Sequence, residues 1–196
     1  NPRRVMMFLA EKGVTDIDVV TLSLQEGEHR TEDFKKKSPL SQIPTLELED
    51  GRALTESRAI CTYIEALHPE PNLMGRDAFE RAFIEMWDRR MELLFSMPLM
   101  MWVRHGNPVL AAVERNQNAE VASYNQGQAM RMAKWLDSEL ATRAWIAGDR
   151  FTIADITACC GVDFAKMNRW RPGDDLPNLK RWRDAFSARA SGKVAA

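Results

Sequence analysis

Cysteine is scarce in this sequence, and long hydrophobic runs are missing from it. Three cysteines in 196 residues, two of them adjacent at Cys159 and Cys160, are too few and too unevenly spaced for a disulfide framework. No run approaches the ~20 apolar residues of a membrane-spanning helix. The opening residues Asn1-Pro2-Arg3-Arg4 lead into an amphipathic stretch without a signal-peptide cleavage site. We therefore predict a cytoplasmic protein that does not span a membrane.

An excess of charge is also missing, because 27 Lys and Arg oppose 28 Asp and Glu for a net charge of −1. This balance gives no electrostatic reason to bind nucleic acid or an anionic membrane surface. The sequence has no glycine-rich phosphate loop and no His, Cys, Asp and Glu set at metal-ligand spacing. We therefore expect no nucleic acid, membrane or metal ion among its partners.

The chain has enough hydrophobic residues, 45%, to fold as a globular protein. It divides best at His68-Pro69-Glu70-Pro71-Asn72, where two prolines deny helical conformation to the residues before them. All six tryptophans and eight of the eleven methionines lie beyond residue 78. We predict a first domain over 1–68, a linker over 69–77 and a second domain over 78–196.

The first half is predicted to be a mixed unit in the order α-β-loop-β-β-α. Its expected elements are a helix that ends at Gly13, strands over 17–21, 45–49 and 52–55, and a helix over 57–67. Asp50-Gly51 is expected to join the last two strands through a type I′ turn, which requires a positive φ at both residues.

The second half has helical periodicity almost throughout, and Pro98 is expected to kink or end its first helix. Thr152 and Asp155 have the spacing of a capping box, and Phe151 and Ile156 occupy the positions of a hydrophobic staple. A helix should start there, and a last helix is expected over about 179–190. The predicted fold class is an α/β domain followed by an all-α domain.

Short motifs lie in a fixed order along the chain. They are Glu28-His29-Arg30 before Phe34, Ser41-Gln42-Ile43-Pro44-Thr45-Leu46, Asp50-Gly51, Leu54-Thr55-Glu56-Ser57-Arg58-Ala59-Ile60, the Pro-Glu-Pro linker, and Phe151-Thr152-Ile153-Ala154-Asp155. Together they resemble the cytosolic glutathione S-transferase family, including its bacterial theta-like and nu-like members, over nearly the whole chain. The resemblance implies a thioredoxin-like first domain, glutathione as co-substrate and a homodimer.

The resemblance also implies a set of glutathione-binding residues. They are His29, Gln42, Ile43, Pro44, Glu56 and Ser57. In the family the Ile-Pro peptide is cis and its backbone pairs with the cysteinyl part, while the Glu-Ser pair holds the γ-glutamyl end. A helix N-terminus favours an anion, which suits the γ-glutamyl carboxylate. From the residues alone, Ser57 as a plain helix cap, His29 as a solvated loop residue and 35–37 as a solvated helix face stay open.

The family's thiol-activating residue lies in a loop after a first strand, and this sequence resembles the family only from the following helix onward. We therefore expect the first strand and most of the catalytic loop to precede Asn1. Asn1 is itself a candidate catalytic residue, with a helix N-cap as the alternative. The implied mechanism is activation of the glutathione thiolate rather than attack by a protein nucleophile.

The resemblance implies an electrophile site on the helix near Pro98. Its candidate residues are Met97, Met100, Met101 and Trp102, with Arg104 and His105 at the polar end. Flexible methionines suit a permissive apolar site, although methionine and aromatic stripes are also typical of a core. Cys61, Cys159 and Cys160 are predicted to be packing residues.

Three functions stay open at this point. The first is a glutathione transferase that conjugates small hydrophobic electrophiles, a detoxification reaction. The second is glutathione-dependent reduction of disulfides or peroxides, and the third is a non-catalytic module of the same fold that serves interaction. The implied homodimer places the helix after Glu56 against the partner's second half.

Overall fold

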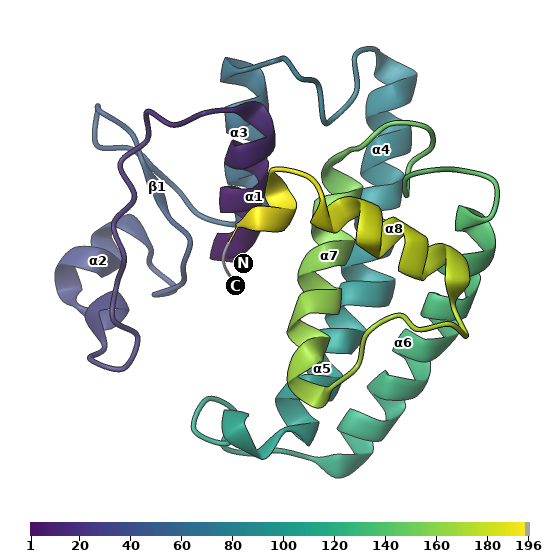
Figure 1. Ribbon diagram of the computed structural model, residues 1–196. Helices are drawn as coiled ribbons and strands as arrows, with labels where there is room; N and C mark the ends of the chain where they lie inside the picture. Colours follow the sequence, from purple (N-terminus) through teal and green to yellow (C-terminus); the bar gives the residue numbers. More distant parts are fainter. Residues whose placement is uncertain (195–196) are drawn as a thin grey trace.

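The computed structural model describes residues 1–194 and shows a small α/β half beside a larger helical half (Figure 1). The first half contains α1 (Pro2–Lys12), α2 (Glu32–Lys37), β1 (Leu46–Glu47), β2 (Ala53–Leu54) and α3 (Ser57–Leu67). The second contains α4 (Ala78–Arg90), a π-helical segment (Met91–Ser96), α5 (Met97–Gly106), α6 (Ala119–Leu140), α7 (Ile153–Ala165) and α8 (Pro177–Ser187). The expected order, α/β and then all-α, is confirmed.

Helices α1 and α3 run parallel, so both N-termini lie at one end of the pair. Arg4 in the first turn of α1 bonds Ser57 at the start of α3, and Lys12 in the last turn pairs with Glu65 near the end of α3. Pro2 is tolerated in the first turn, and Gly13 ends α1 with a left-handed φ of 66°. The same end of both helices therefore presents free backbone N–H groups.

The β-hairpin is formed as expected, but its turn differs from the predicted type I′. Leu46 pairs with Leu54 and Glu47 with Ala53 in antiparallel register. Of the two turn residues only Gly51 has a positive φ, 83°. The Gly51 N–H donates to the Leu48 carbonyl at 2.9 Å, and the Leu48 N–H donates to the Arg52 carbonyl at 2.8 Å. The strands are thus joined by a three-residue loop in which glycine alone takes the left-handed conformation.

The strand predicted over 17–21 is wrong. These residues form an unpaired segment, because within residues 1–194 only β1 and β2 pair in a sheet and no strand lies alongside the segment. Its alternating sequence leaves Val19 and Val20 exposed. Periodicity identified a segment able to extend, but a strand also requires a neighbour.

Pro98 does not end the helix that begins at α4. The backbone instead widens into π-helix over the six residues Met91–Ser96 and returns to α-helix at Met97, with Pro98 in the first turn of α5. Ser96 packs against Gly161 of α7, where an added Cβ would lie 2.6 Å from Ser96 Oγ. The π-segment is therefore fitted closely to α7.

The start of α7 is a capping box, as expected. Asp155 accepts hydrogen bonds from the Thr152 N–H at 2.9 Å, the Ile146 N–H at 3.0 Å and Trp182 Nε1 at 2.8 Å. Phe151 and Ile156 are both buried. One carboxylate therefore joins α7, the loop before it and α8.

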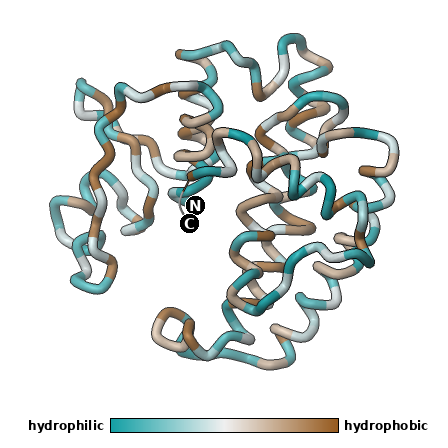
Figure 2. The backbone as a smooth tube through the Cα atoms, viewed as in Figure 1, coloured by the Kyte–Doolittle hydropathy of each residue, from teal (hydrophilic) through white to brown (hydrophobic). Residues whose placement is uncertain are grey.

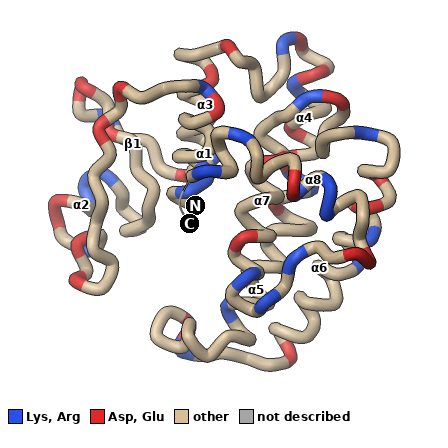
Figure 3. The backbone as a smooth tube through the Cα atoms, in the orientation of Figure 1, with Lys and Arg blue, Asp and Glu red and all other residues tan. Residues whose placement is uncertain are grey.

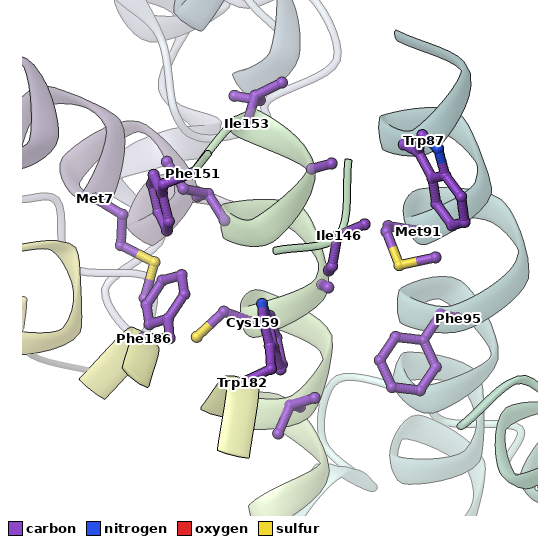
Figure 4. Close-up of a cluster of buried hydrophobic side chains, with 14 of the residues drawn as sticks. Met7, Trp87, Met91, Phe95, Ile146, Phe151, Ile153, Cys159, Trp182 and Phe186 are labelled. Carbon is purple, nitrogen blue, oxygen red and sulfur yellow. The ribbon is translucent and has the colours of Figure 1, made fainter. Parts of the chain in front are cut away.

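The core lies on both sides of α7 (Figure 4). Trp87, Met91 and Phe95 cover one side, and Phe186 and Met7 lie on the other, so the first half shares this core through α1. Hydrophobic positions follow the packed helices, and hydrophilic positions follow the outer turns and loops (Figure 2). The last helix begins at Pro177, two residues before the expected start.

Candidate functional site

The hairpin register brings two of the sequence motifs together. Because Leu46 lies opposite Leu54 in antiparallel register, the residues just before β1 and the residues just after β2 lie at the same end of the hairpin. The Ile43–Pro44 peptide is cis, which confirms that expectation. Two motifs twelve residues apart in the sequence therefore lie at the same end of the hairpin.

The backbone at Glu56 has an unusual conformation, with a φ of 63° and a ψ of 112°. Glu56 is the N-cap residue of α3 and its side chain makes no capping hydrogen bond, while Ser57 is the first helical residue. The alternative that Ser57 is a plain helix cap is therefore wrong. A non-glycine residue with positive φ is strained, and such residues concentrate at ligand-binding sites.

Ser57 is 4% exposed and contacts a charged side chain from α1. Arg4 Nη1 donates to Ser57 Oγ at 3.2 Å and to Glu92 Oε1 at 3.1 Å. Glu92 belongs to the π-segment. The start of α3, the start of α1 and the long helix of the second half therefore meet at Arg4.

The next residue, Arg58, anchors the first turn of α3 to the helical half. Its Nε donates to Asp88 at 2.5 Å, and Asp88 also accepts from the Thr157 hydroxyl at 2.5 Å. Burial opposes the charge of Arg58, but Asp88 and Glu85 outweigh it and raise the pKa of the guanidinium. This buried ion pair fixes α3 against α4 and α7.

The loop before the cis peptide is held by Ser38. Ser38 is fully buried; its hydroxyl donates to the Gln42 carbonyl at 2.9 Å and accepts from the Gln42 N–H at 3.0 Å. The Gln42 side chain is exposed, and Ser41 has a φ of 54°. Sequence reasoning selected Gln42 and missed Ser38. The available signal for Ser38 was its position in the same loop, four residues before Gln42.

His29 lies in a short 3₁₀ turn, where its Nε2 accepts from Arg30 Nε at 3.2 Å. Its Nδ1 is buried and has no hydrogen-bond partner in residues 1–194. Lys35, Lys36 and Lys37 are exposed and pair with acidic side chains, as expected of a solvated helix face. Within residues 1–194 no hydrogen bond joins His29 to Ser57.

Asn1 occupies the N-cap position of α1, but its side chain makes no capping hydrogen bond. Its carbonyl accepts from the Arg4 N–H at 3.0 Å. A side-chain capping role is therefore not supported, and the Asn1 amide stays at the N-terminal end of α1. The N-termini of α1 and α3 together provide positive dipole ends within one region.

The candidate electrophile residues lie on more than one face of α5. Met97, Met101 and Arg104 share a face at spacings of four and three; Met97 is 45% exposed and Arg104 is exposed. Trp102 packs against the core. Sequence reasoning missed Leu93 and Leu94, exposed apolar residues just before Met97.

Two hollows were found elsewhere in the described part of the chain. One lies along α8, and the other, of about 300 Å³, lies between α4 and the loop before α7. Within residues 1–194 no three His, Cys, Asp or Glu side chains group as a metal site. None of the helices described has the length and apolar character of a membrane span.

The three cysteines carry no reactive thiol. Burial raises the pKa of Cys61 to about 12, and burial also raises the pKa of Cys159 and of Cys160. A raised pKa keeps a thiol protonated and unreactive at neutral pH. Charged residues of both signs are scattered along the backbone of both halves (Figure 3).

Comparisons with known proteins agree with this geometry. The family model for the glutathione S-transferase N-terminal domain matches residues 1–67, and the model for the C-terminal domain matches residues 100–190. Glutathione S-transferase 2 of Saccharomyces cerevisiae is 34% identical over 194 residues, which covers 98% of this chain and 83% of that protein.

Two crystal structures are similar over nearly the whole chain. Gtt2 from Saccharomyces cerevisiae has a TM-score of 0.89 at 34% identity, covering 98% of this chain and 93% of that one. A glutathione S-transferase domain-containing protein from Marinobacter aquaeolei has a TM-score of 0.90 at 35% identity, covering 97% and 94%. The chain therefore belongs to the glutathione S-transferase family of enzymes.

Proposed function

We propose that this protein binds glutathione at the joined N-termini of α1 and α3 and activates its thiol for conjugation to small hydrophobic electrophiles. The observation that carries the proposal is that the cis Ile43–Pro44 peptide and the Glu56–Ser57 pair lie at the same end of the hairpin. Ile43 offers backbone groups to the cysteinyl part. The first turn of α3 offers free N–H groups and the Ser57 hydroxyl to the γ-glutamyl carboxylate, and Glu56 offers a carboxylate to the ammonium. His29 and Gln42 are proposed to approach the glycine end.

Thiolate activation at this site needs no protein base or metal. With a thiol pKa of ~8.5, about 3% is ionised at pH 7; a fall to ~6.5 raises this to about three-quarters and requires about 2.7 kcal/mol. One hydrogen bond to the thiolate contributes ~1.5–3 kcal/mol, and a helix N-terminus contributes ~0.3–1 kcal/mol. The α1 N-terminus supports this role, and Asn1 is the proposed donor within residues 1–194.

The proposed electrophile site is the apolar face around the exposed Met97 and the half-buried Met101, with Trp102 behind it and Arg104 at its polar end. Glu92 supports this assignment, because its contact with Arg4 brings the π-segment before Met97 to the start of α3. We propose 1–68 as the glutathione-binding domain, 69–77 as the linker and 78–196 as the electrophile-binding domain. The three free cysteines support a cytoplasmic location, and the proposed conjugation would serve detoxification.

Calorimetric titration of the full-length natural protein with glutathione tests the proposal. Saturable binding is expected, weakened about tenfold in Ser57→Ala, because one hydrogen bond to a charged group is lost. Ser123→Ala, on the exposed surface of α6, is the matched control and should bind like wild type. Absence of binding at millimolar glutathione would refute the proposal and favour the interaction module. Comparing an activated aryl chloride with a mixed disulfide as co-substrate separates conjugation from reduction.

We also propose a homodimer, supported by an aromatic pair on the outer face of α4. Phe79 stacks on Phe83 with ring centroids 5.9 Å apart, and Phe79 is 78% exposed. Phe83 is half-buried against the core, so Phe79 is the ring that a partner subunit would cover. Sedimentation should give twice the chain mass of 22.4 kDa, and a monomer at micromolar concentration would contradict the proposal.

A further inference from the structure

Arg4 is a buried charged residue that the function proposed above does not use. It is 6% exposed, although it lies in the first turn of α1. Its Nη1 bonds one hydroxyl, on Ser57, and one carboxylate, on Glu92. A buried guanidinium must be compensated by charge and hydrogen bonds, and both of these bonds come from Nη1, whereas the Arg4 Nε is buried without a partner in residues 1–194.

The contact with Ser57 restricts the serine hydroxyl. A hydroxyl has one proton to donate and two lone pairs to accept, whereas a guanidinium only donates. Arg4 therefore takes a lone pair of Ser57 Oγ and leaves the single proton for another partner. Across residues 1–194, no side chain or carbonyl accepts a hydrogen bond from that hydroxyl. The proton is thus left for a ligand beside the first turn of α3.

We propose that Arg4 is a positioning residue for glutathione: by donating to Ser57 Oγ, it directs the serine proton at the α-carboxylate of the γ-glutamyl group. The inference rests on the proposed function and adds a specificity determinant to it. A hydroxyl directed in this way favours an acceptor such as a carboxylate over a ligand without one. Arg4 acts through Ser57 and does not touch the ligand itself.

A chain of ion pairs holds Arg4 in this position. Glu92 pairs with both Arg4 and Arg89, Glu85 pairs with both Arg89 and Arg58, and Arg58 is the residue after Ser57 on α3. Together with the hydrogen bond from Arg4 to Ser57, these ion pairs connect Ser57 to Arg58 on the same turn of α3. Positive and negative side chains alternate along this chain of ion pairs, so the charge of Arg4 is compensated locally. We attribute its role to the direction of the hydroxyl rather than to attraction of an anion from a distance.

The test compares glutathione with two analogues in the full-length natural protein. In 4-aminobutyryl-cysteinyl-glycine the α-carboxylate is replaced by hydrogen, and in glutaryl-cysteinyl-glycine the α-amine is replaced by hydrogen. Wild type should prefer glutathione over the first analogue by about 10- to 100-fold in Kd, the range for a charge-assisted hydrogen bond. In Arg4→Met this preference should fall about tenfold, while the preference over the second analogue should not change.

Three further variants separate positioning from loss of structure. Arg4→Lys, which keeps a donor, should recover part of the preference. Arg3→Met, which removes the neighbouring arginine bonded to Asp163, should leave the preference unchanged. In the background of Ser57→Ala, Arg4→Met should have no further effect on it. If Arg4→Met alone does not fold, Arg4→Met/Glu92→Leu replaces both charges by apolar groups and should show the same tenfold fall.

The outcomes distinguish this inference from the proposed function. Wild type that binds no glutathione overturns both. Wild type that prefers the carboxylate, together with Arg4→Met variants that prefer it equally, overturns the role of Arg4 alone. Equal loss of affinity for all three ligands in Arg4→Met also overturns it, because that pattern indicates general disruption.

Discussion

Replacing Asp155 by alanine should cause a large loss of stability. The carboxylate is fully buried and accepts hydrogen bonds from the N–H groups of Ile146 and Thr152 and from Trp182 Nε1. The variant leaves three buried donors without a partner, and each costs about 1–3 kcal/mol. The free energy of unfolding should therefore fall by at least about 3 kcal/mol, a large part of the roughly 5–15 kcal/mol available to a folded protein.

Urea denaturation at pH 7, followed by tryptophan fluorescence, measures this loss. The matched control is Asp77→Ala, because Asp77 also caps a helix but is exposed and accepts only from the Glu80 N–H, at 2.9 Å. The control should lose about 1 kcal/mol, as is usual for an exposed N-cap. A loss in Asp155→Ala no larger than in the control would refute the argument that burial sets the energy of this capping box.

The remaining predictions concern pH and two glycines. Burial raises the pKa of Asp155 to about 6 against its hydrogen bonds. The folded state therefore binds the carboxyl proton of Asp155 more tightly than the unfolded state does. The contribution of this proton to the free energy of unfolding is present at low pH and is lost as the pH rises through 6. Relative to Asp155→Asn, wild type should lose about 2 kcal/mol between pH 4 and 7; a constant difference in urea titrations would contradict the raised pKa. Gly161→Ala should lower the thermal midpoint and cost about 1–3 kcal/mol, because the new Cβ meets Ser96 at 2.6 Å; an unchanged midpoint would show that α7 can shift. Gly127→Ala on α6, whose Cβ meets only Arg131 at 3.5 Å, should instead stabilise by about 0.5–1 kcal/mol, and a lower midpoint would contradict this.

Local signals in the sequence predicted the helices well. Residues 57–67 form α3 as expected, and the Thr152–Asp155 spacing formed the expected capping box, because both depend on groups within a turn or two of one another. The hairpin was found from Asp50-Gly51, but only Gly51 took a positive φ. The strand expected over 17–21 failed because pairing requires a partner that periodicity does not reveal.

The predictions for the candidate site divide in the same way, into motifs that the sequence revealed and long-range contacts that it did not. Motif resemblance selected Ile43–Pro44 and Glu56–Ser57 as candidates, and the hairpin register puts these two motifs at the same end of the hairpin. The sequence contained no signal for Arg4 or Glu92, because their contacts with Ser57 and with each other span 53 and 88 residues. The sequence also did not show that Trp102 packs against the core, because the face that α5 turns to the core depends on the π-segment before it.

The sequence by itself determined the division into an α/β and an all-α half, the helix starts and the family, because these follow from periodicity, capping and short motifs along the chain. The tertiary structure alone decided that α1 and α3 present their N-termini together and that a buried arginine meets the serine at the start of α3. Those features depend on packing between segments far apart in sequence. A buried charge is compensated, and a hydroxyl proton is directed, only by contacts between such segments.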